Sequence, residues 1–205
     1  MIHTRTPQEK VTLESTWCRA MDQFVAKSSQ YPNGDPSGWY PDTLWPHLIK
    51  GYHPGTMLDL GCGQGQVVDW FQGQGIDSHG VDFSESAIQG NSRLIQHDIS
   101  TGPIGLNSDL VWSCEFVEHI EEEHVDNLIS AIDSATGSVL AMTHAVVGQG
   151  GTHHVNCRPM RYWIEKIQGS TDLRFDSVAT WTARRVAKFG YFARSGLIFV
   201  RGNNA

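Results

Sequence analysis

A short segment in the middle of the chain, CEFVEHI (Cys114–Ile120), concentrates side chains that can hold a cation. Glu115, Glu118 and His119 fall within five residues, and their side chains can converge on one point where the backbone bends. Carboxylate oxygens and a neutral imidazole suit Mg²⁺, Mn²⁺ or Zn²⁺. The alternative is that Glu115 holds a ligand through hydrogen bonds while His119 caps a helix. The segment therefore predicts either a metal centre or a bend that binds a ligand through polar side chains.

Two adjacent histidines lie farther along, in the segment THHVN that follows the glycine-rich turn GQGG (148–151). We expect one of His153 and His154 to fold back with this turn and reach the same site, as a further metal ligand or as a general base. His144, in the preceding apolar run, is a third candidate. The other histidine of the pair would make a structural hydrogen bond, and Asn156 could anchor either ring. The alternative is that both histidines only brace the loop.

A glycine-rich turn, LDLGCGQG (Leu58–Gly65), follows an apolar run and opens a helical pattern. Gly61, Gly63 and Gly65 alternate along it, so the backbone can approach a ligand closely and the first N–H groups of the helix are free to face it. Alone, this turn is equally compatible with a tight strand-to-helix connection that binds nothing.

Acidic residues end the next two expected strands. Asp82 comes 21 residues after Gly61, where it can accept two hydrogen bonds from ribose hydroxyls. A charged acceptor makes such bonds stronger than a neutral one. Asp98, in the segment HDI, ends the following strand. Because three strand ends carry suitable polar groups, a ribose-bearing ligand is favoured over an empty turn.

These residues must be positioned by alternating strands and helices, which imply a parallel sheet with crossover connections. The expected strands cover 57–60, 76–82, 93–98, 109–116 and 137–147. The expected helices cover 66–72, 84–90 (with Ser84 as its N-cap), 121–134 and 158–168. Two last strands, 178–182 and 196–201, are expected to pair as an antiparallel hairpin at the sheet edge.

The amino-terminal part of the chain is expected to differ from this regular pattern. A helix is predicted over 10–27 and an ordered lid or loop, rich in proline and aromatic residues, over 31–48. We therefore divide the chain into an amino-terminal helix and lid, 1–55, and a main domain, 56–205. A group of aromatic residues suits stacking on a flat ring or a sugar face, or equally a place in the core: Trp17, Tyr31, Trp39, Tyr40, Trp45 and Trp163.

Composition limits the possible classes of protein. The 205 residues are 40% hydrophobic and 18% charged, as expected of one globular domain. No apolar run is long enough for a bilayer and the first ten residues lack a signal-peptide core, so we expect a cytoplasmic protein without a membrane partner. Four scattered cysteines without a CxxC pair argue against disulfides and a zinc knuckle.

Charge is distributed unevenly along the chain, whose formal net charge is −7. Residues 57–133 hold fourteen Asp and Glu against one basic residue, Arg93, which argues against nucleic acid as a partner. From Cys157 to the end, nine Lys and Arg face three acids. These cations either contact an anionic substrate or lie at solvated strand edges.

Together the GCGQG turn, the strand ends at Asp82 and Asp98 and the segment WSCEFVEHI resemble the class I S-adenosylmethionine-dependent methyltransferases, over about 56–147. The resemblance implies a Rossmann-like α/β fold: a seven-stranded, mostly parallel sheet with helices on both faces and a carboxy-terminal antiparallel hairpin. A dehydrogenase would need GxGxxG, whereas the third glycine here follows the second by two residues. The residues that the resemblance assigns to S-adenosyl-L-methionine are Asp59 (loop or amino group), Gly61, Cys62 and Gly63 (methionine part), Asp82 (ribose), Phe83, Asp98 and Ile99 (adenine), and Cys114.

The pattern E-x-x-E-H further resembles two branches of this class, the ubiquinone-pathway O-methyltransferases and the small-RNA 2′-O-methyltransferases. Both branches imply a divalent metal, and the RNA branch adds a histidine from beyond the fifth strand. The implied ligands here are Glu115, Glu118, His119 and His154. More residues separate the His pair from Trp163 than separate the two residues of the H-x-x-x-W motif in the RNA enzymes. This longer spacing argues against an RNA acceptor.

The sequence thus predicts a methyltransferase that O-methylates a small hydroxylated acceptor such as a sugar, diol or catechol. Glu115, His153 and His154 are the candidate catalytic residues, acting with Mg²⁺, Mn²⁺ or Zn²⁺. One alternative is a metal-independent N- or O-methyltransferase with a histidine base. The other is a non-catalytic scaffold that binds the cofactor. The N/D-P-P-Y motif of base methyltransferases is absent, and the sequence leaves the oligomeric state open.

Overall fold

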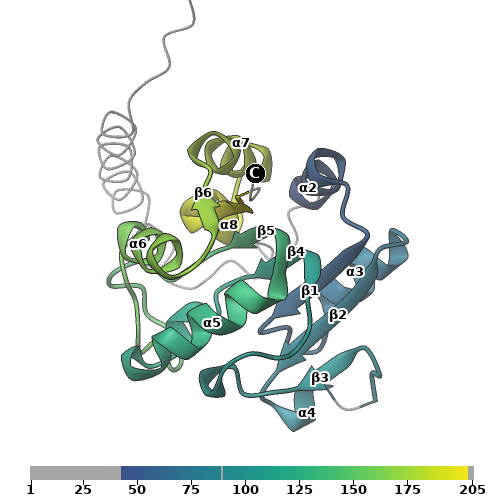
Figure 1. Cartoon of the computed structure of the whole chain (residues 1–205), viewed down its shortest axis with the longest axis horizontal. Coiled ribbons are helices and arrows are strands. Elements are labelled where there is room, and N and C mark those ends of the chain that lie inside the picture. Colours follow the sequence, from purple (N-terminus) through teal and green to yellow (C-terminus); the bar gives the residue numbers. More distant parts are fainter. Residues whose placement is uncertain (1–42, 89, 203–205) are drawn as a thin grey trace, which may run out of the picture.

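The computed structural model describes residues 43–88 and 90–202 (Figure 1). The helix expected over 10–27 and most of the lid expected over 31–48 lie outside these residues. The last part of that lid is not a loop, because α2 (Leu44–Tyr52) begins there. Pro46 is accommodated in its first turn, where a missing N–H costs nothing.

A seven-stranded sheet forms the centre of the fold, as predicted. Its strands are β1 (Thr56–Leu60), β2 (Asp77–Asp82), β3 (Leu94–Gln96), β4 (Ser108–Ser113), β5 (Thr136–Met142), β6 (Leu173–Phe175) and β7 (Leu197–Arg201). They lie in the order β3-β2-β1-β4-β5-β7-β6. The first five are parallel, and β7 runs antiparallel to both β5 and β6. The strand order reverses between β1 and β4, and open α/β sheets bind ligands beside such a reversal, at the carboxyl ends of the strands.

Helices cover both faces of the sheet (Figure 1). They are α3 (Gln66–Gly73), α4 (Glu85–Ile88), α5 (Val125–Ala135), α6 (Met160–Ser170), α7 (Ser177–Ala187) and α8 (Gly190–Ser195). In the described part of the chain, 3₁₀ turns lie between these helices and strands: η2 (Ile99–Thr101), η3 (Val117–His119) and η4 (Glu122–His124). Within the described residues no helix has both the length and the apolar character that a membrane span requires.

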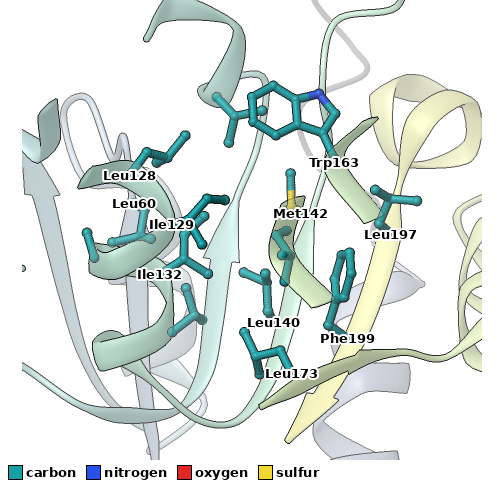
Figure 2. Packing of buried hydrophobic residues seen from close by; sticks show 14 of the residues in the cluster. Leu60, Leu128, Ile129, Ile132, Leu140, Met142, Trp163, Leu173, Leu197 and Phe199 are labelled. Atoms are coloured by element: carbon teal, nitrogen blue, oxygen red, sulfur yellow. The ribbon is translucent and has the colours of Figure 1, made fainter. Parts of the chain in front are cut away.

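Two hydrophobic clusters, one on each face, fix this arrangement. Successive side chains of a strand point to opposite faces, so Leu140 and Met142 of β5 pack toward α5 and α6. Figure 2 shows them beside Ile132 and Trp163 from these helices. On the other face, Trp45 of α2 meets other aromatic rings, with centroids 4.9 Å from Trp70, 5.6 Å from Phe71 and 5.8 Å from Trp112. Trp45 and Trp163 are therefore core residues rather than stacking platforms.

The predicted carboxy-terminal hairpin is wrong in its details. Residues 178–182 lie in α7, and the strand that pairs with β7 at the sheet edge is β6, which is separated from it along the chain by α7 and α8. Asp176 caps α7 by accepting a hydrogen bond from the Ala179 N–H at 2.8 Å. The buried positions of α7 follow a helical spacing that the β-branched composition of the short window concealed: Thr180, Ala183, Arg184 and Ala187.

Two strands end earlier than predicted, and one helix begins later than predicted. β4 ends at Ser113 and β5 at Met142, whereas strands were expected to reach 116 and 147. α5 starts at Val125, after η4. The chain thus leaves both strands just before the segments that carry Glu115 and His144, and these segments form the carboxyl edge of the sheet.

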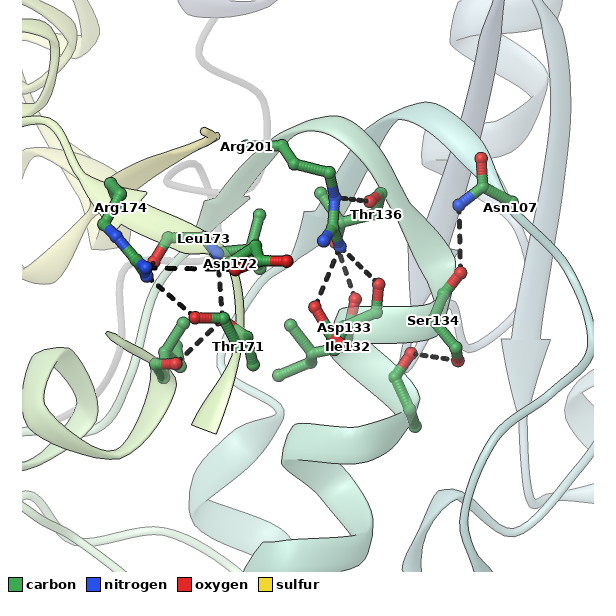
Figure 3. A network of polar contacts seen from close by, with 12 residues as sticks. Asn107, Ile132, Asp133, Ser134, Thr136, Thr171, Asp172, Leu173, Arg174 and Arg201 are labelled. Carbon is green, nitrogen blue, oxygen red and sulfur yellow. Dashed lines mark hydrogen bonds and ion pairs between the residues drawn. The ribbon is translucent and has the colours of Figure 1, made fainter. Parts of the chain in front are cut away.

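Arg201 fastens the last strand to the rest of the sheet (Figure 3). It donates to the Thr136 carbonyl at 2.8 Å and to the Asp133 carboxylate at 2.9 Å. This places the end of β7 against the α5–β5 connection, while its first residue, Leu197, pairs with Met142 at the other end of β5.

Candidate active site

The glycine turn after β1 opens onto a cavity. Gly61 and Gly63 have φ values of +78° and +50°, in the left-handed region where a side chain is strained. A Cβ on Gly61 would lie 2.3 Å from the Phe116 ring, whereas a Cβ on Gly63 would meet no atom within 4 Å. Gly61 is thus required by packing, and Gly63 exposes its backbone to open space.

Asp82, at the end of β2, holds this turn in place. Its Oδ2 accepts a hydrogen bond from the Gly63 N–H at 2.9 Å, and its Oδ1 accepts one from the Ser84 N–H at 2.9 Å. The structure therefore brings together the two features that the sequence placed 19 residues apart. Each carboxylate oxygen keeps further acceptor capacity on the cavity side.

All nine residues predicted for the cofactor line one cavity of about 1930 Å³. Phe83 is 73% exposed at its rim, while Cys62 and Ile99 are buried. Asp98 does not end its strand directly: it follows β3 by two residues and caps η2, accepting hydrogen bonds from the Ser100 N–H and hydroxyl. The cavity is large enough for two small molecules side by side.

Asp59 is a buried carboxyl group beneath the turn. Only 3% of the residue is exposed. Burial, and then the negative charge of Asp82, raise the pKa of Asp59 to about 8. The group is therefore mostly neutral at pH 7, and a cation in the cavity would favour its ionised form.

Asp59→Asn is expected to reduce the pH dependence of stability. Folded Asp59 keeps its proton up to about pH 8, whereas an unfolded aspartate loses it near pH 4. The folded chain thus binds more protons between these values, so this group lowers the free energy of unfolding as pH rises, by at most about 1.4 kcal/mol per pH unit. Urea unfolding at about pH 5.5 and about pH 8 would measure the difference. The exposed substitution Glu123→Gln should keep the parental slope, and an equal slope in Asp59→Asn would contradict the prediction.

The acidic segment after β4 turns sharply at Glu115, whose φ is +50°. Its Oε1 accepts from the Thr143 hydroxyl at 2.8 Å and its Oε2 from the Gln149 amide at 2.5 Å. Arg194 of α8 lies 3.6 Å from Oε2 and also donates to the Gln149 side-chain oxygen. Burial raises the pKa of Glu115, and these neighbours counteract that rise. Glu115 is thus held by polar side chains, and it is not among the described residues whose ligand atoms converge, so its role as a metal ligand stays a prediction.

The other three predicted metal ligands do come together. One ligand atom from each of Glu118, His119 and His154 lies within 4.8 Å of the others. Glu118 is fully buried, and within the described part of the chain neither of its carboxylate oxygens makes a hydrogen bond of normal geometry, although the backbone N–H groups of Glu118 and Ala145 lie near enough to lower its pKa. Burial, and then the charge of Glu115, raise the pKa of Glu118 to about 8. Without a ligand the buried group is therefore mostly neutral at pH 7, and a cation held between it and the two imidazoles would favour its ionised form.

The side chains of the two adjacent histidines point in different directions. His153 points outward, with Nε2 3.3 Å from Glu121, and its side chain is 58% exposed. The ring of His154 turns inward, 5.0 Å from that of His119 between centroids. Gly151 makes room for it, because a Cβ there would lie 2.2 Å from His154 Nε2. Both histidines line the cavity.

The third histidine candidate, His144, is excluded from this cluster. It is 1% exposed, its Nδ1 lies 3.2 Å from the Ala145 carbonyl, and it does not line the cavity. Burial lowers the pKa of His144 to about 4. Asn156 anchors neither histidine ring: its side chain donates to the Ile120 carbonyl at 3.1 Å.

Sequence reasoning missed the residues that hold Glu115. Gln149 lies in the glycine-rich turn GQGG, directly before the two histidines that were expected to reach the site. Its place near the site could therefore have been inferred. No local signal identifies Arg194, which follows Glu115 by 79 positions and reaches it only because α8 lies against the carboxyl edge. Thr143 follows β5 directly and pairs with the end of β4, since its N–H donates to the Ser113 carbonyl at 2.9 Å.

Comparison with known proteins decides the family. Residues 15–170 match the family described as "methyltransferase domain". The chain belongs to this methyltransferase family. A search of curated protein sequences found no match. The predicted class is thereby confirmed at the level of the methyltransferase family, while the E-x-x-E-H branch remains a prediction.

Solved methyltransferases share the fold of this methyltransferase at low identity. A TehB-like SAM-dependent methyltransferase from Corynebacterium glutamicum is 19% identical, with a TM-score of 0.58, and the match covers 96% of this chain and 100% of that one. Magnesium protoporphyrin IX methyltransferase from Synechocystis, with bound SAH, is 18% identical at a TM-score of 0.55, covering 98% and 90%. The methyltransferase domain of bacterial CtHen1 is 15% identical at a TM-score of 0.54, covering 77% and 94%.

Proposed function

We propose that this methyltransferase transfers a methyl group from S-adenosylmethionine to a hydroxyl of a small acceptor, a sugar, diol or catechol-like molecule, with the help of a divalent cation. The observation that carries the proposal is the fully buried carboxylate of Glu118, without a hydrogen bond of normal geometry among the described residues and close to His119 and His154. This donor set fits Mg²⁺, Mn²⁺ or Zn²⁺.

The donor end of the cavity is assigned to the glycine turn. Gly63 exposes its backbone, and Asp82 presents carboxylate oxygens where ribose hydroxyls would lie. Asp59 and Asp82 together favour a ligand that carries positive charge, as a sulfonium and its amino group do. Phe83, exposed at the rim, is available to the adenine.

The acceptor end is assigned to the Glu/His cluster. Glu118, His119 and His154 would hold the cation, which stabilises the developing charge on the acceptor oxygen. Burial is the main cause that lowers the pKa of His119, which favours the neutral imidazole that metals bind. His153, which lines the cavity and has Glu121 3.3 Å from its Nε2, takes the acceptor proton.

The reaction is an in-line displacement, so alignment contributes most of the catalysis. The acceptor oxygen forms a bond to the methyl carbon while the carbon–sulfur bond breaks. The products are the methyl ether, S-adenosylhomocysteine and the proton held by His153.

Metal-independent transfer with His154 as the base is the second candidate. One observation favours it: Glu115, the fourth predicted ligand, is occupied by Thr143, Gln149 and Arg194 instead of joining the cluster. In that mechanism His154 itself accepts the proton from a more acidic acceptor hydroxyl.

Chelation separates the two candidates. Methyl transfer from labelled S-adenosylmethionine would be measured over a panel of catechols and sugar diols, after chelator treatment and after return of Mg²⁺, Mn²⁺ or Zn²⁺. We expect chelation to lower the rate about 100-fold, because bound cations supply several kcal/mol at the transition state. Metal analysis of the untreated protein would identify the ion. An unchanged rate after chelation would contradict the metal and leave the His154 mechanism.

A further inference from the structure

A second wall of the cavity, formed by α7, α8 and their connection, is basic and aromatic. Trp181, Arg185, Lys188, Tyr191 and Arg194 all line it. The acidic residues that line the same cavity come from other elements, the glycine turn and the carboxyl ends of the strands: Asp59, Asp82, Asp98, Glu115 and Glu121. Basic side chains therefore lie on the wall formed by α7 and α8, and acidic side chains lie on the wall formed by the glycine turn and the strand ends.

Two cations of this wall are distinguished because no carboxylate of the described residues pairs with them. Of the nine Lys and Arg after position 156, Arg184 is buried and donates to the Gly196 carbonyl at 2.7 Å. Arg185 and Lys188 have no carboxylate within 4.0 Å among residues 43–88 and 90–202. Six others each pair with a carboxylate: Arg158, Arg161, Lys166, Arg174, Arg194 and Arg201.

The aromatic neighbour of Arg185 keeps this cation oriented. The guanidinium carbon lies 4.4 Å from the centroid of the Trp181 ring, and Trp181 is 46% exposed. Stacking over indole holds the planar guanidinium while its N–H groups at the edge stay available to an anion. Arg194 is not available in this way, since Glu115 and Gln149 already contact it.

We propose that Arg185 and Lys188 form a subsite for an anionic group, a carboxylate or a phosphate, carried by the acceptor. The separation of charge orients such a molecule. Its anionic group is attracted to the cations of α7 and the α7–α8 connection, so its hydroxyl end is directed toward the donor methyl. The subsite explains why two exposed cations line the cavity without a carboxylate partner among residues 43–88 and 90–202.

The proposal rests on the proposed function for the identity of the cavity as an acceptor site, but it can be tested by binding alone. Calorimetry on the protein saturated with S-adenosylhomocysteine would compare two matched pairs of probes. These are 3,4-dihydroxybenzoate against its amide, and ribose 5-phosphate against ribose. The first pair tests a carboxylate and the second a phosphate.

We expect the anion of one pair to bind about tenfold more tightly than its neutral partner, as two exposed charge contacts allow. In the double variant Arg185→Gln/Lys188→Gln this preference should fall to about twofold or less, and raised salt should weaken it in the parent. The control Arg174→Gln, which removes an exposed cation of β6 outside the cavity, should keep the preference.

Several outcomes would overturn the subsite: equal affinities within both pairs, no binding of either anion, or a preference that survives in the double variant. A loss of S-adenosylhomocysteine affinity in the double variant would overturn it too, because the two cations would then serve the donor. Thermal unfolding would confirm that the double variant is folded. Anion binding without any methyl transfer would contradict the proposed function and leave this subsite standing.

Discussion

Glu118→Gln is expected to lower metal-assisted methyl transfer by about 100-fold or more, while the affinity for S-adenosylhomocysteine stays unchanged. The substitution removes an anionic oxygen from the cation cluster without changing the size of the side chain. It leaves the glycine turn and Asp82 intact, and these are the residues assigned to the donor. Initial rates and calorimetry on the same preparation would measure both quantities.

The isosteric choice matters because Glu118 is fully buried. Its pKa of about 8 means that the cation-free protein already holds this side chain mostly in the neutral form at pH 7. Gln preserves that neutrality and the packing, so thermal unfolding should show a folded variant. The substitution Glu118→Ala would instead leave a cavity in the core. A loss of activity could then not be distinguished from a loss of folded structure.

The matched control is Glu123→Gln, which removes an equivalent charge from η4, where the side chain is 80% exposed. It should retain the parental rate. Full activity in Glu118→Gln, with or without chelator, would remove the cluster from the mechanism, whereas a loss of activity that chelator does not mimic would favour a structural role.

The parts of the site that the sequence predicted well are those fixed by neighbours along the chain. A left-handed glycine turn after a strand, and an acidic residue at the end of the next strand, meet because adjacent parallel strands place their carboxyl ends together. Asp82 and Gly63 are such a pair, and their contact is present at 2.9 Å. The alternating pattern likewise predicted the sheet itself.

The parts that could not be predicted depend on contacts between distant segments. The environment of Glu115 is decided by Arg194 and Gln149, which arrive from α8 and from the turn after β5. The residues expected as a strand over 178–182 lie in a helix, because Thr180 belongs to a buried stripe of helical spacing that continues to Ala187 and that only the folded core reveals. Short windows of sequence do not contain this information.

Asp82→Ala is the second substitution with a large expected effect, and it concerns the binding of the methyl donor. We expect the affinity for S-adenosylhomocysteine to fall by about 30- to 300-fold. The carboxylate fixes the Gly63 N–H and would accept from the ribose, and hydrogen bonds to a charged group contribute about 1.5–3 kcal/mol each. Calorimetric titration would measure the loss.

The control for this variant lies on the same strand. Asp77→Ala removes an equal charge at the other end of β2, where Asp77 is exposed and away from the cavity, and should leave the affinity unchanged. An affinity of Asp82→Ala within about threefold of the parent would contradict the assignment of this residue to the donor, because even one lost charged hydrogen bond should exceed that change.

Asp82→Ala has a second consequence that a merely structural role would not produce. The charge of Asp82 is one cause of the raised pKa of Asp59. Removing it should lower the pKa of Asp59, so the fall of stability with rising pH should end at a lower pH than in the parent. Lost donor affinity together with this shift would show that the two carboxyl groups act as one electrostatic unit beneath the glycine turn. Lost affinity without the shift would confine the role of Asp82 to its hydrogen bonds.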